Sequence, residues 1–236
     1  MYSVNIELAG FVCRIESEYR LSVGLYRSFQ TDASHDFSIT LTANDICIIE
    51  RAGKSFPGII TEHILQKVTD ALIDFNTLLI HGVAIALDKC AYLFAASSGT
   101  GKTTHCELWQ EKQRDTVFIN GDKPFIRFHA DGSQPLVCGS PWAGKEDMYT
   151  NTMIPLKDIV LMERAEDNHI EQISFAEAFP GLLQQVYRPD DEEKMRKTLR
   201  LMQRLSPAVT FWRFQCNNFK DDCFDVAYNA LVKGQP

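Results

Sequence analysis

Residues 95–104, AASSGTGKTT, constrain the fold of this chain more than any other stretch. An apolar run, AYLFAAS (91–97), leads into them, and KTTHCELWQEK (102–112), which predicts a helix, follows. This strand–loop–helix order turns a helix N-terminus toward an anion. The phosphate-loop (Walker A) pattern G-x-x-x-x-G-K-[ST] is matched except at its first position, where Ala96 stands. Because that position ends a strand and needs a small residue more than a positive φ, we expect a phosphate loop.

The residue types in this loop suit a nucleotide. Gly99 and Gly101 let consecutive backbone N–H groups curl around phosphate oxygens. Lys102 can reach the β and γ phosphates, and the Thr103 hydroxyl can ligate Mg²⁺. The alternative, a glycine-rich turn with a surface lysine, fits the flanking strand and helix less well. The predicted nucleotide-binding residues are Ser98, Gly99, Thr100, Gly101, Lys102, Thr103 and Thr104.

Three further sites carry candidate polar groups. The apolar run DTVFING (115–121) ends just before Asp122, where a phosphate-loop enzyme needs an acid for Mg²⁺ or for a water. Asp122 alone is equally a turn residue, and its functional interpretation depends on the loop. His81 in LLIHG is a catalytic candidate, although a histidine beside glycine is more often structural. In GSPWAGKE (139–146), Ser140 and Lys145 can hold an anionic substrate group, or Pro141 simply turns the chain.

The remaining sequence predicts an α/β fold with a substantial antiparallel part. Period-two alternation predicts strands, helical spacing and caps predict helices, and Asp88-Lys89 predicts a tight turn between two strands. Ser174 and Glu177 form a capping box that starts a helix. We expect strands within 4–16, 37–50, 77–87, 91–97, 115–121 and 209–215, hairpins at 125–142 and 158–174, and helices at 62–75, 102–112, 191–205 and 221–232.

Composition limits the partners and the compartment. A net charge of −7 argues against nucleic acid or an anionic membrane as a partner, because either favours a basic face. The seven cysteines include no C-x-x-C pair, so we expect reduced thiols. No apolar run approaches the roughly 18 residues of a membrane span, and the start lacks a signal-peptide pattern. The sequence therefore predicts a cytoplasmic protein.

Four motifs together carry a family resemblance. HGVAIAL, AASSGTGKTT, FINGD and GSPWAGK, followed by PLKDIVLMER, resemble the catalytic domain of HPr serine kinase/phosphorylases, and more closely the smaller stand-alone HPr-kinase-like proteins. The resemblance runs from about residue 78 to residue 165. It implies a phosphoenolpyruvate-carboxykinase-type phosphate-loop fold, with a mixed β-sheet core, flanking helices and N-terminal antiparallel strands. We expect residues 1–57 to form a β-rich region packed on a catalytic domain of residues 58–236.

The resemblance also implies roles. The family's loop residues correspond to Gly99, Gly101, Lys102 and Thr103, its general base to Asp122 and its histidine to His81. The implied cofactors are ATP and Mg²⁺, with Thr103 and Asp122 as metal ligands, and a homo-oligomer is compatible with it. The implied activity is transfer of the γ-phosphate to a serine-like hydroxyl of a peptide, protein or small metabolite.

The chain departs from the family at several positions. Gly121 replaces the first acid of the family's acidic pair, GSPWAGKE has a different form, and the C-terminal signature of true HPr kinases is not visible. These departures favour an acceptor other than HPr. Two alternatives stay open: a nucleotide-binding module or assembly factor without transfer chemistry, which Gly121 favours, and a phosphate-loop ATPase whose acceptor is water.

Overall fold

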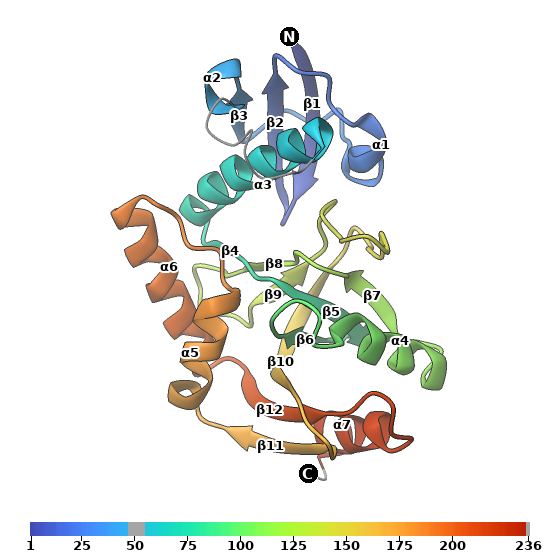
Figure 1. Ribbon diagram of the computed structural model, residues 1–236. Helices are drawn as coiled ribbons and strands as arrows, with labels where there is room; N and C mark the ends of the chain where they lie inside the picture. Colours follow the sequence, from blue (N-terminus) through green and yellow to red (C-terminus); the bar gives the residue numbers. More distant parts are fainter. Residues whose placement is uncertain (47–54, 235–236) are drawn as a thin grey trace.

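A computed structural model describes residues 1–46 and 55–234. Figure 1 shows a small N-terminal sheet stacked above a large mixed sheet, with α3 crossing one face of the small sheet. The small sheet consists of β1 (Tyr2–Leu8), β2 (Phe11–Ser17) and β3 (Phe37–Leu41). Their alternating side chains bury one face, as the period-two pattern predicts.

Two details of the N-terminal prediction are wrong. The strands are not all antiparallel, because β3 pairs in parallel with β2, after a crossover through α1 (Val23–Tyr26) and the 3-10 turn η1 (Arg27–Phe29). The strand predicted over 37–50 ends at Leu41 and is followed by α2 (Ala43–Ile46). The Asp45 carboxylate accepts hydrogen bonds from the backbone and hydroxyl of Thr42, which starts this helical turn. Residues 47–50 of that prediction lie outside the described residues.

Helix α3 (Phe56–Asp74) begins six residues before the predicted start, with Ser55 at its N-cap. Its buried side chains share one hydrophobic cluster with β1, β2 and β3, and with Leu79, Phe125 and Trp142 of the lower part. The proposed division at residue 57 falls in the first turn of this helix and stays a prediction.

The large sheet mixes parallel and antiparallel pairs. Its order is β4 (Thr77–Leu79), β8 (Phe125–Arg127), β9 (Leu136–Cys138), β10 (Met153–Arg164), β6 (Cys90–Ala95), β5 (Gly82–Leu87) and β7 (Val117–Asn120). The predicted hairpins β5–β6, with Asp88 and Lys89 at positive φ, and β8–β9 are confirmed. The run 77–87 divides into β4 and β5.

Residues 158–174 do not form the predicted hairpin. The strand β12 (Thr210–Cys216) lies between β10 and β11 (His169–Ile173), parallel to β10 and antiparallel to β11. The Glu166–Asn168 turn instead binds the loop that follows β12, since Asn217 donates to the Glu166 carbonyl and to the Asn168 side chain. The residues after β12 are thereby fixed beside the end of β10.

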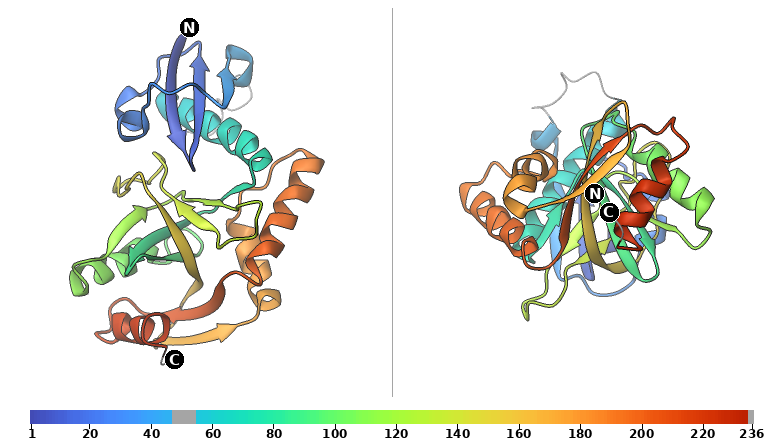
Figure 2. Two further views of the ribbon diagram at one scale, coloured as in Figure 1. Left: turned by 180° about the vertical axis from the view of Figure 1, so that it is seen from behind. Right: turned by 90° about the horizontal axis from the view of Figure 1, so that it is seen from below.

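Helices cover both faces of the large sheet (Figures 1 and 2). Successive residues of β5 face opposite sides: Val83 and Ile85 pack with α4 (Lys102–Lys112) and α7 (Cys223–Leu231), and Ala84 packs with α5 (Phe175–Gln185) and α6 (Glu192–Leu205). The predicted capping box of α5 is present. The fold is therefore a mixed α/β fold with flanking helices. In residues 1–46 and 55–234, no helix combines the length and apolar character needed to cross a bilayer.

Candidate functional site

The glycine-rich segment forms a tight loop between β6 and α4. Gly101 is the N-cap of α4 with φ of 106°, and Gly99 has φ of 78°. These left-handed conformations suit glycine. A Cβ atom on Gly101 would also lie 2.4 Å from the Asn218 side-chain nitrogen. Glycine at 101 is therefore favoured by its conformation, and a side chain there would also displace Asn218.

Lys102 lies inside this loop and not on the surface. Its Nζ donates to the carbonyl oxygens of Ala96 (2.9 Å) and Ser97 (3.2 Å), and only 7% of the residue is exposed. Burial lowers the pKa of Lys102, and the Asp122 carboxylate opposes that effect. This placement does not fit the alternative of a turn with a surface lysine. The Lys102 ammonium is held by carbonyl groups of the loop, where it can contact a bound phosphate.

Asp122 follows β7 in a turn that Asn120 organises. The Asn120 side-chain oxygen accepts from the backbone N–H groups of Asp122 (2.9 Å) and Lys123 (2.6 Å). The Asp122 carbonyl accepts from the N–H of Gly82, which ties the turn to the start of β5. A strand end and two hydrogen bonds therefore fix the backbone that carries the carboxylate.

Two basic side chains contact this carboxylate. Asp122 Oδ1 lies 3.3 Å from His81 Nε2 and 3.1 Å from Lys123 Nζ, and His81 Nδ1 lies 3.1 Å from Gln185 Oε1. Burial alone would raise the pKa of Asp122, but the hydrogen bond from His81 and the charge of Lys123 outweigh it. The pKa is therefore below its ordinary value. The carboxylate is ionised near neutral pH and held in one orientation.

The loop and the carboxylate face the same pocket, with a volume of about 880 Å³, which is within the range of small-ligand sites. All seven predicted nucleotide-binding residues line it, together with His81, Asp122 and Lys145. The further lining residues are Gly121, Gly144, Glu146, Arg164, Ala165, Cys216, Asn217, Asn218 and Phe219. We call this space the loop pocket.

Ser140 is the one predicted site residue outside the lining of the loop pocket. Its buried hydroxyl donates to the Lys123 carbonyl (2.7 Å) and accepts from Asn120 Nδ2 (3.0 Å) and the Trp142 N–H (3.3 Å). The hydroxyl is thus used to fasten the Asp122 turn to the segment 140–142. Ser140 therefore stabilises the backbone of the site from a buried position. This position does not match the expected contact with an anionic substrate.

The packing around Gly121 explains why no acid stands before Asp122. A Cβ atom at Gly121 would lie 2.7 Å from the Ala143 carbonyl oxygen, so a side chain requires this backbone to move. Glu146, three residues further along the same loop, lines the loop pocket. The 143–147 loop therefore brings a second carboxylate, beside that of Asp122, to the wall of the loop pocket.

Sequence reasoning missed the residues that reach the pocket from β10 and β12. Arg164, at the end of β10, donates to the Gly99 carbonyl. Asn218, after β12, donates from Nδ2 to the Gly101 carbonyl (2.9 Å), and its Oδ1 accepts from the thiols of Cys216 and Cys223. The signal was the pair Asn217-Asn218 after a predicted strand, which becomes informative only when β12 is placed beside β10.

Two sets of residues can be considered for a metal. Thr103 and Asp122 offer the hard oxygen atoms that Mg²⁺ prefers, and both line the loop pocket. The second set includes Cys216, which also lines the loop pocket: ligand atoms of His105, Cys216 and Cys223 lie within 4.8 Å of one another. However, the Trp109 N–H donates to His105 Nε2 (3.0 Å), so Nδ1 carries the proton and faces the Cys223 sulfur at 3.4 Å. We interpret this second set as a hydrogen-bond network supporting Asn218.

Comparison with known proteins gives little further information. No family model matches the chain, and no curated protein matches it. Among solved structures, the HPr(Ser) kinase/phosphatase from Coxiella burnetii is similar over 54% of this chain and 90% of its own, with 12% sequence identity and a TM-score of 0.32. The functional interpretation therefore depends on the geometry of the loop pocket.

Proposed function

We propose that this chain is a kinase of the HPr-kinase-like type, with a phosphoenolpyruvate-carboxykinase-type phosphate-loop fold, that transfers the γ-phosphate of ATP to a serine-like hydroxyl. The observation that carries the proposal is the juxtaposition of Asp122 with the glycine-rich loop on the wall of one pocket. A nucleotide-binding module can use a carboxylate here for Mg²⁺, but it does not need a proton acceptor beside the loop. Phosphoryl transfer needs both parts, because the acceptor hydroxyl must lose its proton beside the γ-phosphate.

The proposed reaction assigns a step to each group. Backbone N–H groups of the loop and Lys102 bind the phosphates, and His81 and Lys123 orient the Asp122 carboxylate. Asp122 takes the proton of the acceptor hydroxyl, whose oxygen forms a bond to the γ-phosphorus while the bond to the bridging oxygen of ADP breaks. Thr103 and Asp122 would hold Mg²⁺, which when bound neutralises charge on the β and γ phosphates. Lys145 lines the same pocket and is a further candidate for contact with an anionic group.

The test is transfer from γ-labelled ATP, with Mg²⁺, to panels of free hydroxy-amino acids and serine peptides. We expect Asp122→Asn to slow transfer by about 100-fold or more, the scale of general-base loss, while ATP affinity is kept. The matched control is Asp115→Asn, an exposed carboxylate at the other end of β7, which should leave transfer unchanged.

Two outcomes would contradict parts of this proposal. Full transfer by Asp122→Asn would leave the kinase activity in place and remove Asp122 as its base. ATP hydrolysis that is rapid, needs no acceptor and depends on Lys102 would favour the ATPase, in which water takes the place of the hydroxyl.

A further inference from the structure

A second pocket opens on the other side of Asp122. It has a volume of about 460 Å³ and lies between α1, the start of α3 and the segment 141–147. Asp122 and Gly144 belong to the walls of both pockets, and Lys123 lines the second one. The other lining residues are Ser22, Leu25, Pro57, Gly58, Thr61, Glu62, Leu65, Pro141, Trp142, Ala143 and Asp147. We call this space the helix pocket.

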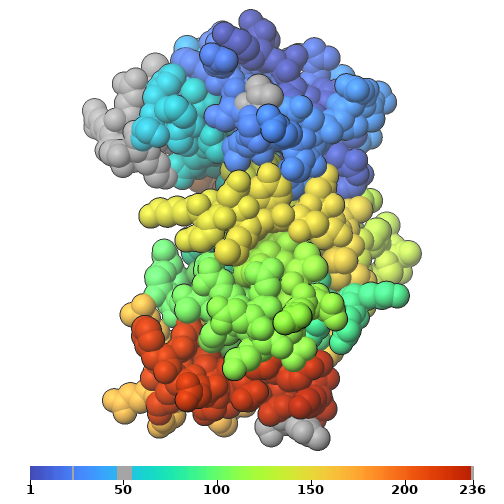
Figure 3. Space-filling view, turned by 90° about the vertical axis from the view of Figure 1, so that its right-hand side faces the viewer, coloured from blue at the N-terminus to red at the C-terminus, as the bar shows by residue number. Residues whose placement is uncertain are grey.

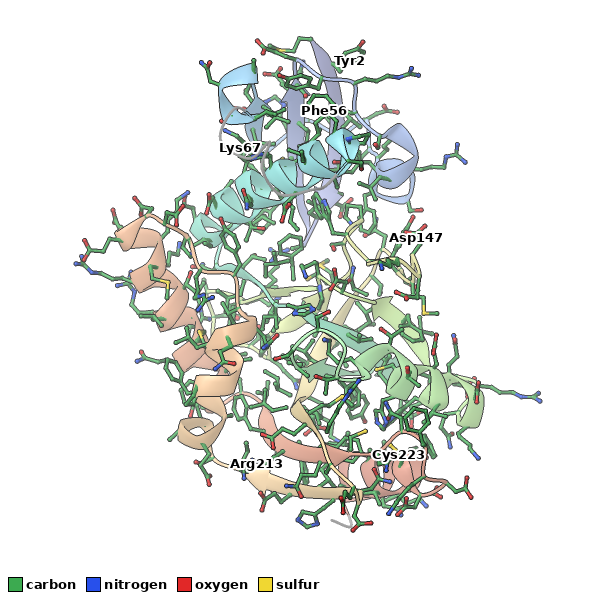
Figure 4. All side chains as sticks on the ribbon, in the orientation of Figure 1. Tyr2, Phe56, Lys67, Asp147, Arg213 and Cys223 are labelled. Carbon is green, nitrogen blue, oxygen red and sulfur yellow. The ribbon has the colours of Figure 1, made fainter. Side chains whose placement is uncertain are left out.

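One wall of the helix pocket is apolar, and its central side chain, Trp142, is held in place by its contacts. Trp142 is 7% exposed, its indole N–H donates to the Thr61 carbonyl at 3.3 Å, and its ring meets Tyr26 edge-on with centroids 6.1 Å apart. Leu25 and Leu65 add aliphatic surface from the two helices. Figure 3 shows the N-terminal part lying directly against the segment around residues 140–150, and Figure 4 labels Phe56 and Asp147 on the two sides. The wall is thus built jointly by both parts of the chain.

Among the described residues that line the helix pocket, the formal charge is negative. Asp122, Glu62 and Asp147 contribute carboxylates and Lys123 contributes an ammonium. Lys123 Nζ lies 3.1 Å from Asp122 Oδ1, so these two charges offset each other and the formal balance of the lining stays negative. A negatively charged compound would meet repulsion here, whereas a neutral or cationic one would not.

We propose that the helix pocket binds the phosphate acceptor, a hydroxyl compound of about tripeptide size that is largely apolar and carries no negative charge. This inference rests on the proposed function and adds the place and chemistry of the acceptor. The nucleotide occupies the loop pocket and the acceptor the helix pocket, so Asp122, which lines both, is adjacent to both reactants. There it takes the hydroxyl proton as the acceptor oxygen binds the γ-phosphorus and ADP leaves. The apolar wall offers few partners to water, the competing acceptor.

The test uses a glycine pair. Gly58, on the exposed face of α3, lines the helix pocket, and only the flexible Ser55 hydroxyl lies near the position of an added Cβ, at 3.3 Å. Gly58→Leu fills the pocket and favours the helix. Gly24→Leu is the matched control, because Gly24 lies on α1 outside the helix pocket and an added Cβ meets nothing within 4 Å. Two capped tripeptides, Leu-Ser-Lys and Leu-Ser-Glu, serve as probes.

Binding of each probe to the Mg·ADP-saturated protein is measured by ligand-observed NMR. We expect the lysine probe to bind about tenfold or more tightly than the glutamate probe, Gly58→Leu to weaken it about tenfold or more, and Gly24→Leu to leave it unchanged. Equal binding of the lysine probe to the wild type and Gly58→Leu, tighter binding of the glutamate probe, or no binding of either, would overturn the inference. ATP affinity and its dependence on Lys102 are measured in parallel. If these persist while the probes fail, the proposed function stands and the acceptor site is elsewhere.

Discussion

Three ionisable side chains, two of them buried and Asp122 partly buried, show how the surroundings determine whether a group is charged. Lys102 and Asp122 line a pocket and have polar partners there, as a site that must meet ions requires. Asp158, on β10, is 2% exposed and lies outside both pockets. Its Oδ1 accepts from the Trp212 indole at 2.8 Å, and Lys157 Nζ is 3.7 Å from Oδ2. These partners do not offset burial, which raises the pKa of Asp158.

The raised pKa of Asp158 predicts that the free energy of unfolding depends on pH. Between the ordinary value near 3.8 and the raised folded value, the folded protein holds a proton that the unfolded chain has lost. The free energy of unfolding therefore falls as pH rises through this window because of Asp158. We expect Asp158→Asn, which keeps an acceptor for Trp212, to remove that fall. Urea unfolding of both proteins from about pH 4 to pH 7 measures the difference. A constant difference across this range would contradict the assignment.

At the scale of elements, the tight turn between β5 and β6 positions β6, the strand that leads into the glycine-rich loop. Asp88 and Lys89 adopt φ of 51° and 64°, the two positive values of a type I′ turn. The non-glycine residue at the second position costs about 1 kcal/mol. We expect Lys89→Gly to raise the free energy of unfolding by about that amount. Ser133→Gly, in the exposed β8–β9 turn without positive φ, is the control and should not stabilise. Calorimetry that shows no gain for Lys89→Gly would contradict the account of the turn.

Local patterns in the sequence were sufficient for many elements and insufficient for strand partners. The hairpin at Asp88-Lys89 and the capping box of Ser174 depend on neighbours in sequence, and both were predicted. The partner of β10 depends on a strand about fifty residues away, which period-two alternation does not encode. The missed pairing with β12 is why Asn218 was not expected beside Gly101. Ser140 was misplaced because a serine in a loop gives no sign of its burial.

At the scale of the whole molecule, Trp142 joins the N-terminal part to the large sheet. It belongs to the cluster formed by β1, β2, β3 and α3, and it meets Phe125 of β8 edge-on at 6.4 Å. Its indole also bonds to the α3 backbone at Thr61. The two parts are therefore coupled through the segment that carries Lys145 and Glu146 to the loop pocket.

Removal of the Trp142 side chain should destabilise the folded protein. We expect Trp142→Ala to lower the free energy of unfolding by about 3–5 kcal/mol, and Trp142→Phe, which keeps an aromatic ring, by much less. Trp212→Ala is not a suitable comparison, because it also removes the partner of Asp158. Denaturant unfolding followed by circular dichroism makes the measurement. A loss below about 1 kcal/mol for Trp142→Ala would show that the two parts are held together by other contacts.

The central claim is that the loop pocket binds the phosphates of a nucleotide through Lys102. Equilibrium titration of Mg·ATP into the wild type, Lys102→Ala and Asp122→Asn tests it most directly. We predict that Lys102→Ala weakens binding about tenfold or more, a loss of about 1.4 kcal/mol or more, while Asp122→Asn binds much as the wild type does. Wild-type affinity in Lys102→Ala, with the fold intact by circular dichroism, would contradict the claim and remove the nucleotide from this pocket.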